Sequence, residues 1–191
     1  MCGISINLVS ERDILNNSLT HRGPDNYDIF VDNCVKMQFY SLKINDLSNA
    51  GNQPMQIGNC VLICNGEIFN HESLINMFSF QTQSKSDCEV IIHLYLHFKN
   101  IYNNREKTIM DTVCNLLDGE FVFCLSDIEL QKIFYARDPY GVRPMFFNDK
   151  TYSAASELKA FDSKYHESVH QFKPGHFAIV KNDEQSQLHR F

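Results

Sequence analysis

Short strand-like runs constrain the fold of this chain more than any other feature. They are rich in β-branched and aromatic residues and are bounded by Asn, Asp, Gly or Pro, which is typical of strands. The predicted strands are Gly3–Val9, Val35–Leu42, Cys60–Cys64, Glu120–Ser126, Lys132–Ala136 and Gly175–Val180. Because they do not alternate regularly with helices, they predict a layered α+β fold and not a doubly wound parallel sheet.

Helical signals are fewer. Ser86 and Glu89 have the spacing of a capping box, with Ser86 as the cap, and apolar residues then recur at helical intervals as far as Phe98. Asn70 is placed to cap a short helix that runs through Phe78. Two weaker helices are predicted at Asp111–Leu117 and Arg12–Leu19.

The chain has the length of a single domain, which we assign to residues 1–191. Its net charge of −6 and its lack of a basic cluster argue against a nucleic-acid partner. Its apolar stretches are far shorter than the roughly 20 residues of a membrane span, and the first segment lacks the apolar core of a signal peptide. We therefore expect a cytoplasmic protein with no membrane partner.

Seven cysteines are present, an odd number. Their spacing lacks the paired C-x-x-C motifs of a zinc site, so we expect no metal, and most of them are expected to be reduced and buried. An assignment as a thiol-redox or zinc protein would rest on the number of cysteines alone, because their spacing does not support it.

Cys2 differs from the other cysteines by its position. Removal of the initiator Met would leave a nucleophile that carries its own base, because a free α-amine titrates near 7.7–8.0. Cysteine is small enough to permit that removal. Taken alone, however, a Met-Cys start also arises by chance.

Several blocks together give Cys2 a context. In order along the chain they are Cys2-Gly3-Ile4, His21-Arg22-Gly23-Pro24-Asp25, Cys64-Asn65-Gly66-Glu67-Ile68-Phe69-Asn70-His71, Ser86-Asp87-Cys88-Glu89-Val90-Ile91, Leu117-Asp118-Gly119-Glu120-Phe121, Ala136-Arg137-Asp138-Pro139-Tyr140-Gly141-Val142-Arg143-Pro144, Ser156-Glu157-Leu158-Lys159-Ala160 and Pro174-Gly175-His176. They resemble the glutaminase domain of class II glutamine amidotransferases, and most closely the amino-terminal domain of asparagine synthetase. The resemblance covers essentially the whole chain.

This resemblance implies an Ntn-hydrolase fold, a four-layer αββα sandwich of two mainly antiparallel sheets. It implies hydrolysis of glutamine to glutamate and ammonia through a thioester on Cys2, with no cofactor. The oxyanion donors of the family fall on Asn65 and Gly66, where glycine would permit a close approach and an unusual backbone turn. The groups that bind the substrate ammonium fall on Glu67 and Asp87.

The resemblance also assigns roles to three arginines. Arg22 would brace the nucleophile strand, although a surface turn arginine is an equally ordinary interpretation. Arg137 and Arg143 are expected to be structural, pairing with Asp138 or nearby carboxylates.

One departure concerns the substrate carboxylate. The family places an arginine where this chain has Ser41, in the segment Tyr40-Ser41-Leu42-Lys43-Ile44. Losing that charged pair would cost on the order of 2–3 kcal/mol of binding free energy. Strand alternation places Lys43 on the same face as Ser41, so Lys43 either restores the contact or is an ordinary solvated lysine. We count Ser41, Lys43 and Ile44 as candidate substrate-binding residues.

The second departure is one of length. The chain contains no S-G-G-x-D-S loop of the ATP-dependent synthetase half, so we expect no synthetase domain in it. Either a separate ATP-dependent synthetase chain receives the ammonia, as a role in asparagine biosynthesis would require, or the ammonia simply escapes. The alternative is a weak or inactive amidotransferase-fold module that regulates a synthetase partner.

Overall fold

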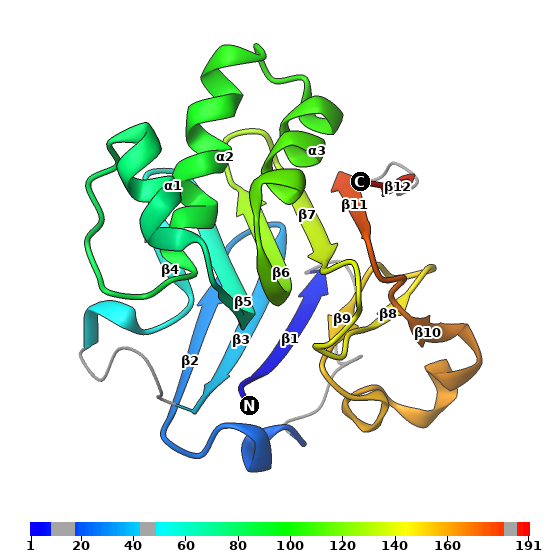
Figure 1. Cartoon of the computed structure of the whole chain (residues 1–191). Helices are drawn as coiled ribbons and strands as arrows, with labels where there is room; N and C mark the ends of the chain where they lie inside the picture. Colours follow the sequence, from blue (N-terminus) through cyan, green and yellow to red (C-terminus); the bar gives the residue numbers. More distant parts are fainter. Residues whose placement is uncertain (9–17, 43–48, 182–186) are drawn as a thin grey trace.

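The computed structural model describes residues 1–8, 18–42, 49–181 and 187–191, and within them two antiparallel six-stranded sheets. Figure 1 shows the order of the elements along the chain. The first sheet has, in spatial order, β10 (Val169–Gln171), β8 (Phe146–Asn148), β9 (Ala154–Ala155), β1 (Gly3–Leu8), β3 (Val35–Ser41) and β2 (Asn26–Val31). The second has β12 (Gln187–Arg190), β11 (His176–Lys181), β7 (Lys132–Arg137), β6 (Gly119–Asp127), β5 (Cys60–Ile68) and β4 (Met55–Ile57).

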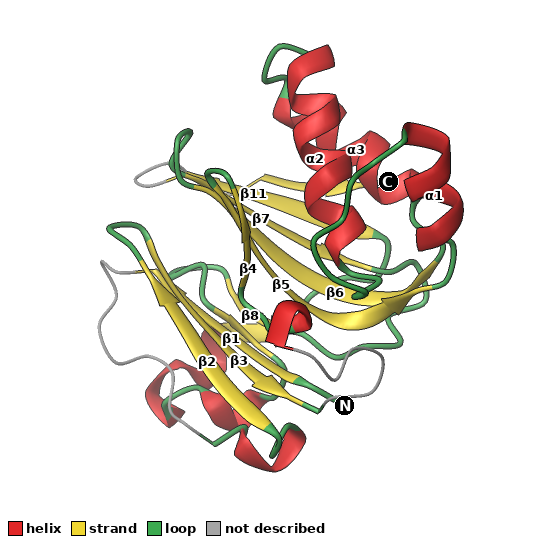
Figure 2. Ribbon diagram, turned by 90° about the vertical axis from the view of Figure 1, so that its left-hand side faces the viewer, coloured by secondary structure: helices red, strands yellow, loops and turns green. Residues whose placement is uncertain are grey.

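The two sheets pack face to face, as the view in Figure 2 shows. Alternate side chains of the central strands fill the space between them, among them Ile4 and Ile6 of β1 and Val61 and Ile63 of β5. Cys60, Leu62 and Cys64 are buried on its other face, so the first half of the strand is a continuous apolar run.

Three helices cover the outer face of the second sheet: α1 (His71–Phe78), α2 (Glu89–Ile101) and α3 (Glu106–Leu116). Their apolar side chains form one cluster with the outward residues of β5, β6 and β7. The outer face of the first sheet is covered by short 3₁₀ helices, including η1 (Thr20–Arg22), η3 (Leu158–Ala160) and η4 (Ser163–Ser168). The remaining 3₁₀ helix of the described residues, η2, spans Asn49–Gly51.

The predicted α+β sandwich of two antiparallel sheets is confirmed. The six predicted strands all form, with ends shifted by a residue or two in most cases. The main exception is the third, which continues four residues beyond Cys64 as the end of β5. β2, β4, β8, β9, β10 and β12 were not predicted, since most of them are short or exposed.

The predicted capping box at Ser86 is wrong. Helix α2 begins at Glu89, and no side chain caps its first turn. The carboxylate of Glu89 instead accepts hydrogen bonds from the backbone N–H groups of Gln83 and Ser84, from the Ser84 hydroxyl and from His93. The buried carboxylate thus fixes the loop that leads into the helix and does not cap its first turn.

The other helix predictions had mixed outcomes. Helix α1 ends at Phe78 as predicted, but the Asn70 side chain does not cap it. Asn70 instead donates to the carbonyl of Leu116 and accepts from the N–H of Asp118, which ties α1 to the end of α3. Helix α3 begins five residues before the predicted start, at Glu106. Most of the predicted helix Arg12–Leu19 lies outside the described residues.

None of the helices in the described ranges is long and apolar enough to cross a membrane.

Candidate active site

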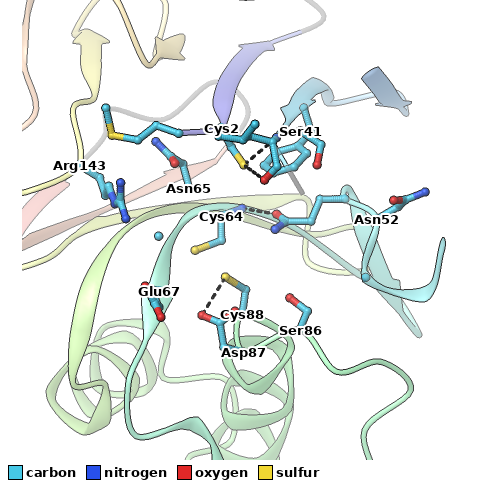
Figure 3. A pocket seen from close by; sticks show the side chains of 16 residues that line it. Cys2, Ser41, Asn52, Cys64, Asn65, Glu67, Ser86, Asp87, Cys88 and Arg143 are labelled. Atoms are coloured by element: carbon cyan, nitrogen blue, oxygen red, sulfur yellow. Dashed lines mark hydrogen bonds between the residues drawn. The ribbon is translucent and has the colours of Figure 1, made fainter. Parts of the chain in front are cut away.

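A pocket opens where β1, β3, β5 and the start of α2 converge (Figure 3). It contains about 740 Å³ of empty space, counting the part open to solvent. Six of the predicted site residues line it: Cys2, Ser41, Asn65, Gly66, Glu67 and Asp87. These residues are up to 85 positions apart in the sequence.

Strand geometry explains why Cys2 and Asn65 meet. Side chains of β5 alternate between its faces, and Val61 and Ile63 point into the core between the sheets. Asn65 follows on that same face, and Cys2 packs against the same core from the start of β1. Figure 3 shows the Asn65 amide beside Cys2.

The Cys2 thiol rests against the end of β3. Because Gly3 pairs with Tyr40, Cys2 lies next to the last residues of that strand. Its Sγ accepts a hydrogen bond from the N–H of Leu42 at 3.3 Å, and the thiol donates weakly to the Leu42 carbonyl at 3.6 Å. Burial raises the pKa of this thiol, with the Leu42 contact and the positive charge of the chain terminus opposing the rise. Met1 precedes Cys2 in this structure, so that charge belongs to Met1.

Asn65 brings a free donor to the pocket. The side chain is 2% exposed, and its Nδ2 has no hydrogen-bond partner among the described residues. A buried amide that lacks a partner costs about 1–3 kcal/mol, which is unusual unless a ligand supplies the missing acceptor. Asn65 Nδ2 is therefore a buried donor without a partner in the described part of the chain, and it lies beside the thiol.

Gly66 lies within β5, opposite Phe121 of β6, and not in a turn. The expectation of an unusual backbone turn at this glycine is therefore wrong, whereas the expectation of a close approach holds. A Cβ on Gly66 would lie 2.5 Å from the carbonyl oxygen of Glu120 and 2.7 Å from the Cα of Phe121. Only glycine lets the two strands approach this closely here.

Two carboxylates face the pocket from the opposite side. Asp87 is buried, and its Oδ2 accepts a hydrogen bond from the N–H of Ile68 at 2.7 Å. That bond fixes the start of α2 against the end of β5. Glu67 lies between Asn65 and Ile68 on β5, with an exposed side chain. Two acidic side chains thus line the end of the pocket opposite Cys2.

Arg22 does not line the pocket but contacts the backbone of Cys2. Its Nε–H donates to the carbonyl of Cys2 at 3.0 Å, and its Nη1 donates to Glu157 at 2.9 Å. The next residue, Gly23, packs against the end of β3, where a Cβ would lie 2.1 Å from the Tyr40 carbonyl oxygen. Burial opposes ionisation of Glu157, but hydrogen bonds from Arg22, Lys159 and His21 lower the pKa of its carboxyl to about 2.

The structure describes one residue of the predicted Ser41, Lys43 and Ile44 group. Ser41 ends β3 and lines the pocket with a buried side chain. Lys43 and Ile44 lie outside the described residues.

The two later arginines differ from each other. Arg143 pairs with Glu120, as expected of a structural arginine, but it also lines the pocket, and its Nε has no partner among the described residues. Arg137 donates to the carbonyls of Gly141, Arg143 and Phe172 and not to a carboxylate. Asp138 accepts from the backbone N–H groups of Phe121, Tyr140 and Val142, which fixes this turn.

Sequence reasoning missed several lining residues, namely Gln53, Cys64, Ser86, Cys88 and Arg143. Four of them stand in the sequence blocks that carry the resemblance, and their presence in these blocks was the signal that could have identified them as pocket residues. Gln53 had no such signal, and its Oε1 reaches the pocket wall by accepting from the N–H of Cys64. In the described part of the chain, no group of three or more His, Cys, Asp or Glu side chains is arranged to hold a metal.

The sequence matches a known protein family and several known proteins. The sequence model of the glutamine amidotransferase domain matches residues 1–166. The chain is 34% identical to the asparagine synthetase (glutamine-hydrolyzing) of Bos taurus and 33% identical to that of Homo sapiens, each over 201 residues. Both matches cover 94% of this chain and 34% of the relative, so the chain spans about a third of their length.

A solved structure agrees on the fold. Glutamine phosphoribosylpyrophosphate amidotransferase from B. subtilis superposes with a TM-score of 0.64 at 21% identity, covering 98% of this chain and 42% of that one. With the family match over most of its length, the chain belongs to the glutamine amidotransferase domain family, and its domain is similar to the glutaminase domain of asparagine synthetase.

Proposed function

We propose that this chain hydrolyses glutamine to glutamate and ammonia, with Cys2 as the nucleophile. The single observation that carries the proposal is the buried Asn65 amide, whose Nδ2 lacks a partner beside the Cys2 thiol. A donor left open next to a nucleophile is the arrangement that stabilises a tetrahedral oxyanion. The backbone N–H of Gly66 is the second proposed donor.

The proposed reaction starts after removal of Met1. The freed α-amine of Cys2 takes the thiol proton, and Sγ attacks the side-chain amide carbon of glutamine. The C–N bond then breaks, the amine returns the proton to the departing ammonia, and a thioester remains. Water attacks the thioester, releases glutamate and restores the thiol.

The remaining residues bind the substrate in this proposal. Asp87 and the Glu67 segment hold the α-ammonium group, because they place negative charge at the end of the pocket opposite Cys2. Ser41, Lys43 and Ile44 form the segment that faces the α-carboxylate. Arg22 positions the nucleophile through the Cys2 carbonyl.

One observation favours a second function, a weak or inactive module that regulates a synthetase. Ser41 lines the pocket where the family has its carboxylate-binding arginine, and a hydroxyl does not replace a guanidinium. Against this, the nucleophile and both proposed oxyanion donors are present in one pocket. In either case we propose that a separate ATP-dependent synthetase chain is the partner, and that it receives the ammonia if the domain is active.

Labelling with a glutamine-like diazo-ketone tests the proposal. Intact mass first establishes whether Met1 has been removed, since a retained Met1 would block the α-amine. Processed protein should be labelled once and should release ammonia from glutamine. Cys2→Ala should abolish both, whereas Cys34→Ala and Cys124→Ala should abolish neither. Labelling that persists in Cys2→Ala would refute the assignment of the nucleophile.

A further inference from the structure

Two cysteines that the proposed hydrolysis does not use face each other at the bottom of the same pocket. Cys64 is in β5, and Cys88 directly precedes helix α2. Both line the pocket, each is 2% exposed, and both are free thiols. Figure 3 shows their side chains pointing toward one another.

Strand alternation explains why Cys64 meets Cys88 and not Cys2. Cys60, Leu62 and Cys64 point from β5 toward the helices and belong to the same apolar cluster as Cys88. Cys2 packs instead against the core on the other face of β5. Cys88 is therefore the natural covalent partner of Cys64.

The surroundings of Cys88 couple this pair to the site. Its thiol donates weakly to Oδ2 of Asp87 at 3.8 Å, the same oxygen that accepts from the Ile68 N–H. The Cys64 thiol, burial and the Asp87 carboxylate together hold the pKa of the Cys88 thiol well above its usual range. Cys88 is thus a protonated thiol at neutral pH, with an acceptor for its proton already in place.

We propose that Cys64 and Cys88 are a modification site, a thiol pair that a peroxide converts to a reversible disulfide and that lowers turnover when oxidised. The disulfide itself needs no assumption about function. Its effect on turnover rests on the proposed hydrolysis of glutamine.

The chemistry needs only the peroxide as oxidant. Sulfur of Cys64 attacks one peroxide oxygen, the O–O bond breaks, the Cys64 thiol proton passes to the departing hydroxide, and a sulfenic acid and water result. Sulfur of Cys88 then attacks the sulfenic sulfur, the S–O bond breaks, and the thiol proton passes through Asp87 to the departing hydroxide. In total two thiols and one hydrogen peroxide give one disulfide and two waters. A dithiol reductant reverses the oxidation by exchange.

The position of the pair gives the disulfide its effect. Cys64 is followed by Asn65, and Cys88 is preceded by Asp87. An S–S bond is about 2.05 Å long, well inside van der Waals contact, so oxidation draws β5 and the start of α2 together. Small displacements of groups that orient a substrate reduce turnover strongly.

Peptide mapping of the full chain tests the pair. The protein is treated with hydrogen peroxide, free thiols are alkylated, and the digest is analysed by mass spectrometry without reductant. A peptide that links Cys64 to Cys88 and disappears with dithiothreitol supports the proposal. No Lys or Arg separates Cys60 from Cys64, so fragmentation must locate the link. If both thiols remain alkylated while Cys2 is oxidised, the proposal is wrong.

Variants then test the effect on turnover. Cys88→Ser should remove the part of the peroxide-induced loss that dithiothreitol restores, whereas Cys60→Ser should retain it, because Cys60 lies on the same face of β5 outside the pocket. If the disulfide forms without changing turnover, the proposal that oxidation lowers turnover is wrong. If untreated processed protein never releases ammonia from glutamine, the proposed function is wrong. In that case the peptide that links Cys64 to Cys88 in the wild-type protein still shows whether the two cysteines are a modification site.

Discussion

The Nε–H of Arg22 donates a hydrogen bond to the backbone carbonyl of Cys2 across 3.0 Å. The same guanidinium pairs with Glu157, so one side chain connects the start of the nucleophile strand to the segment before η3. The contact fixes the backbone carbonyl of Cys2 itself, two bonds away from the carbon that carries the thiol. It gives Arg22 a positioning role in the proposed reaction.

Arg22→Ala should lower kcat while leaving KM for glutamine nearly unchanged, because Arg22 touches the nucleophile and not the pocket. Loss of a charge-assisted hydrogen bond should also lower the free energy of unfolding by about 1.5–3 kcal/mol. Lys159→Ala is the matched control, since Lys159 pairs with the same carboxylate without contacting Cys2. Its kcat should match wild type. Equal kcat values for both variants would contradict the positioning role.

Glu157 makes the stability of the fold sensitive to acid. The pKa of its carboxyl is about 2 when folded, against an ordinary value of 4.5, so the unfolded chain binds more protons between these values. The stabilisation is therefore complete above about pH 4.5 and is lost as the pH falls toward 2. Unfolding by denaturant at several pH values measures this slope. Glu157→Gln should flatten the slope, and an unchanged slope would show that other carboxylates produce it.

Asn65→Ala should separate activity from stability. Removing an oxyanion donor lowers kcat by about 10²–10³-fold. The thermal midpoint should change little, because the packing lost with this buried side chain is offset by removal of an Nδ2 that has no partner among the described residues. Kinetics and thermal unfolding on the same sample test both parts. A lowered midpoint with normal kcat would make Asn65 a structural residue.

Gly66→Ala should lower stability as well as activity, unlike Asn65→Ala. The new methyl group would meet backbone atoms of Glu120 and Phe121 at 2.5 and 2.7 Å, so β5 and β6 must separate. Both the thermal midpoint and kcat should fall, by a mechanism that Asn65→Ala does not share. A Gly66→Ala protein with wild-type stability would show that the two strands have more room than this structure gives them.

Ser41→Arg tests whether the missing guanidinium limits glutamine binding. The position lines the pocket, so the new side chain can reach the substrate carboxylate. KM should fall by about 30- to 150-fold with kcat little changed. Ser41→Ala is the control and should behave like wild type.

Lys43→Ala distinguishes the two interpretations of that lysine. If Lys43 already binds the carboxylate, its removal should raise KM, and Ser41→Arg should gain little in the wild-type background. If KM is unchanged in Lys43→Ala, the lysine has no role in binding.

The sequence was least informative where a side chain at a helix start has a competing partner. Ser86 and Glu89 have capping-box spacing, yet Glu89 binds the loop just before α2, at Gln83 and Ser84. Asn70 stands at a cap position, yet its amide joins α1 to the end of α3. In each case the side chain takes a partner outside the first turn of its own helix, which the local spacing does not reveal.

The sequence by itself determined the strand-rich α+β class, the candidate nucleophile Cys2 and the blocks that identify the family, because these depend on residue type and order. Only the tertiary structure decided which side chains share a site. Alternation along β5 places Asn65 with Cys2 and Cys64 with Cys88, on opposite faces of one strand. Which face meets which partner depends on how the two sheets and α2 pack, and that information is spread over contacts between residues far apart in the chain.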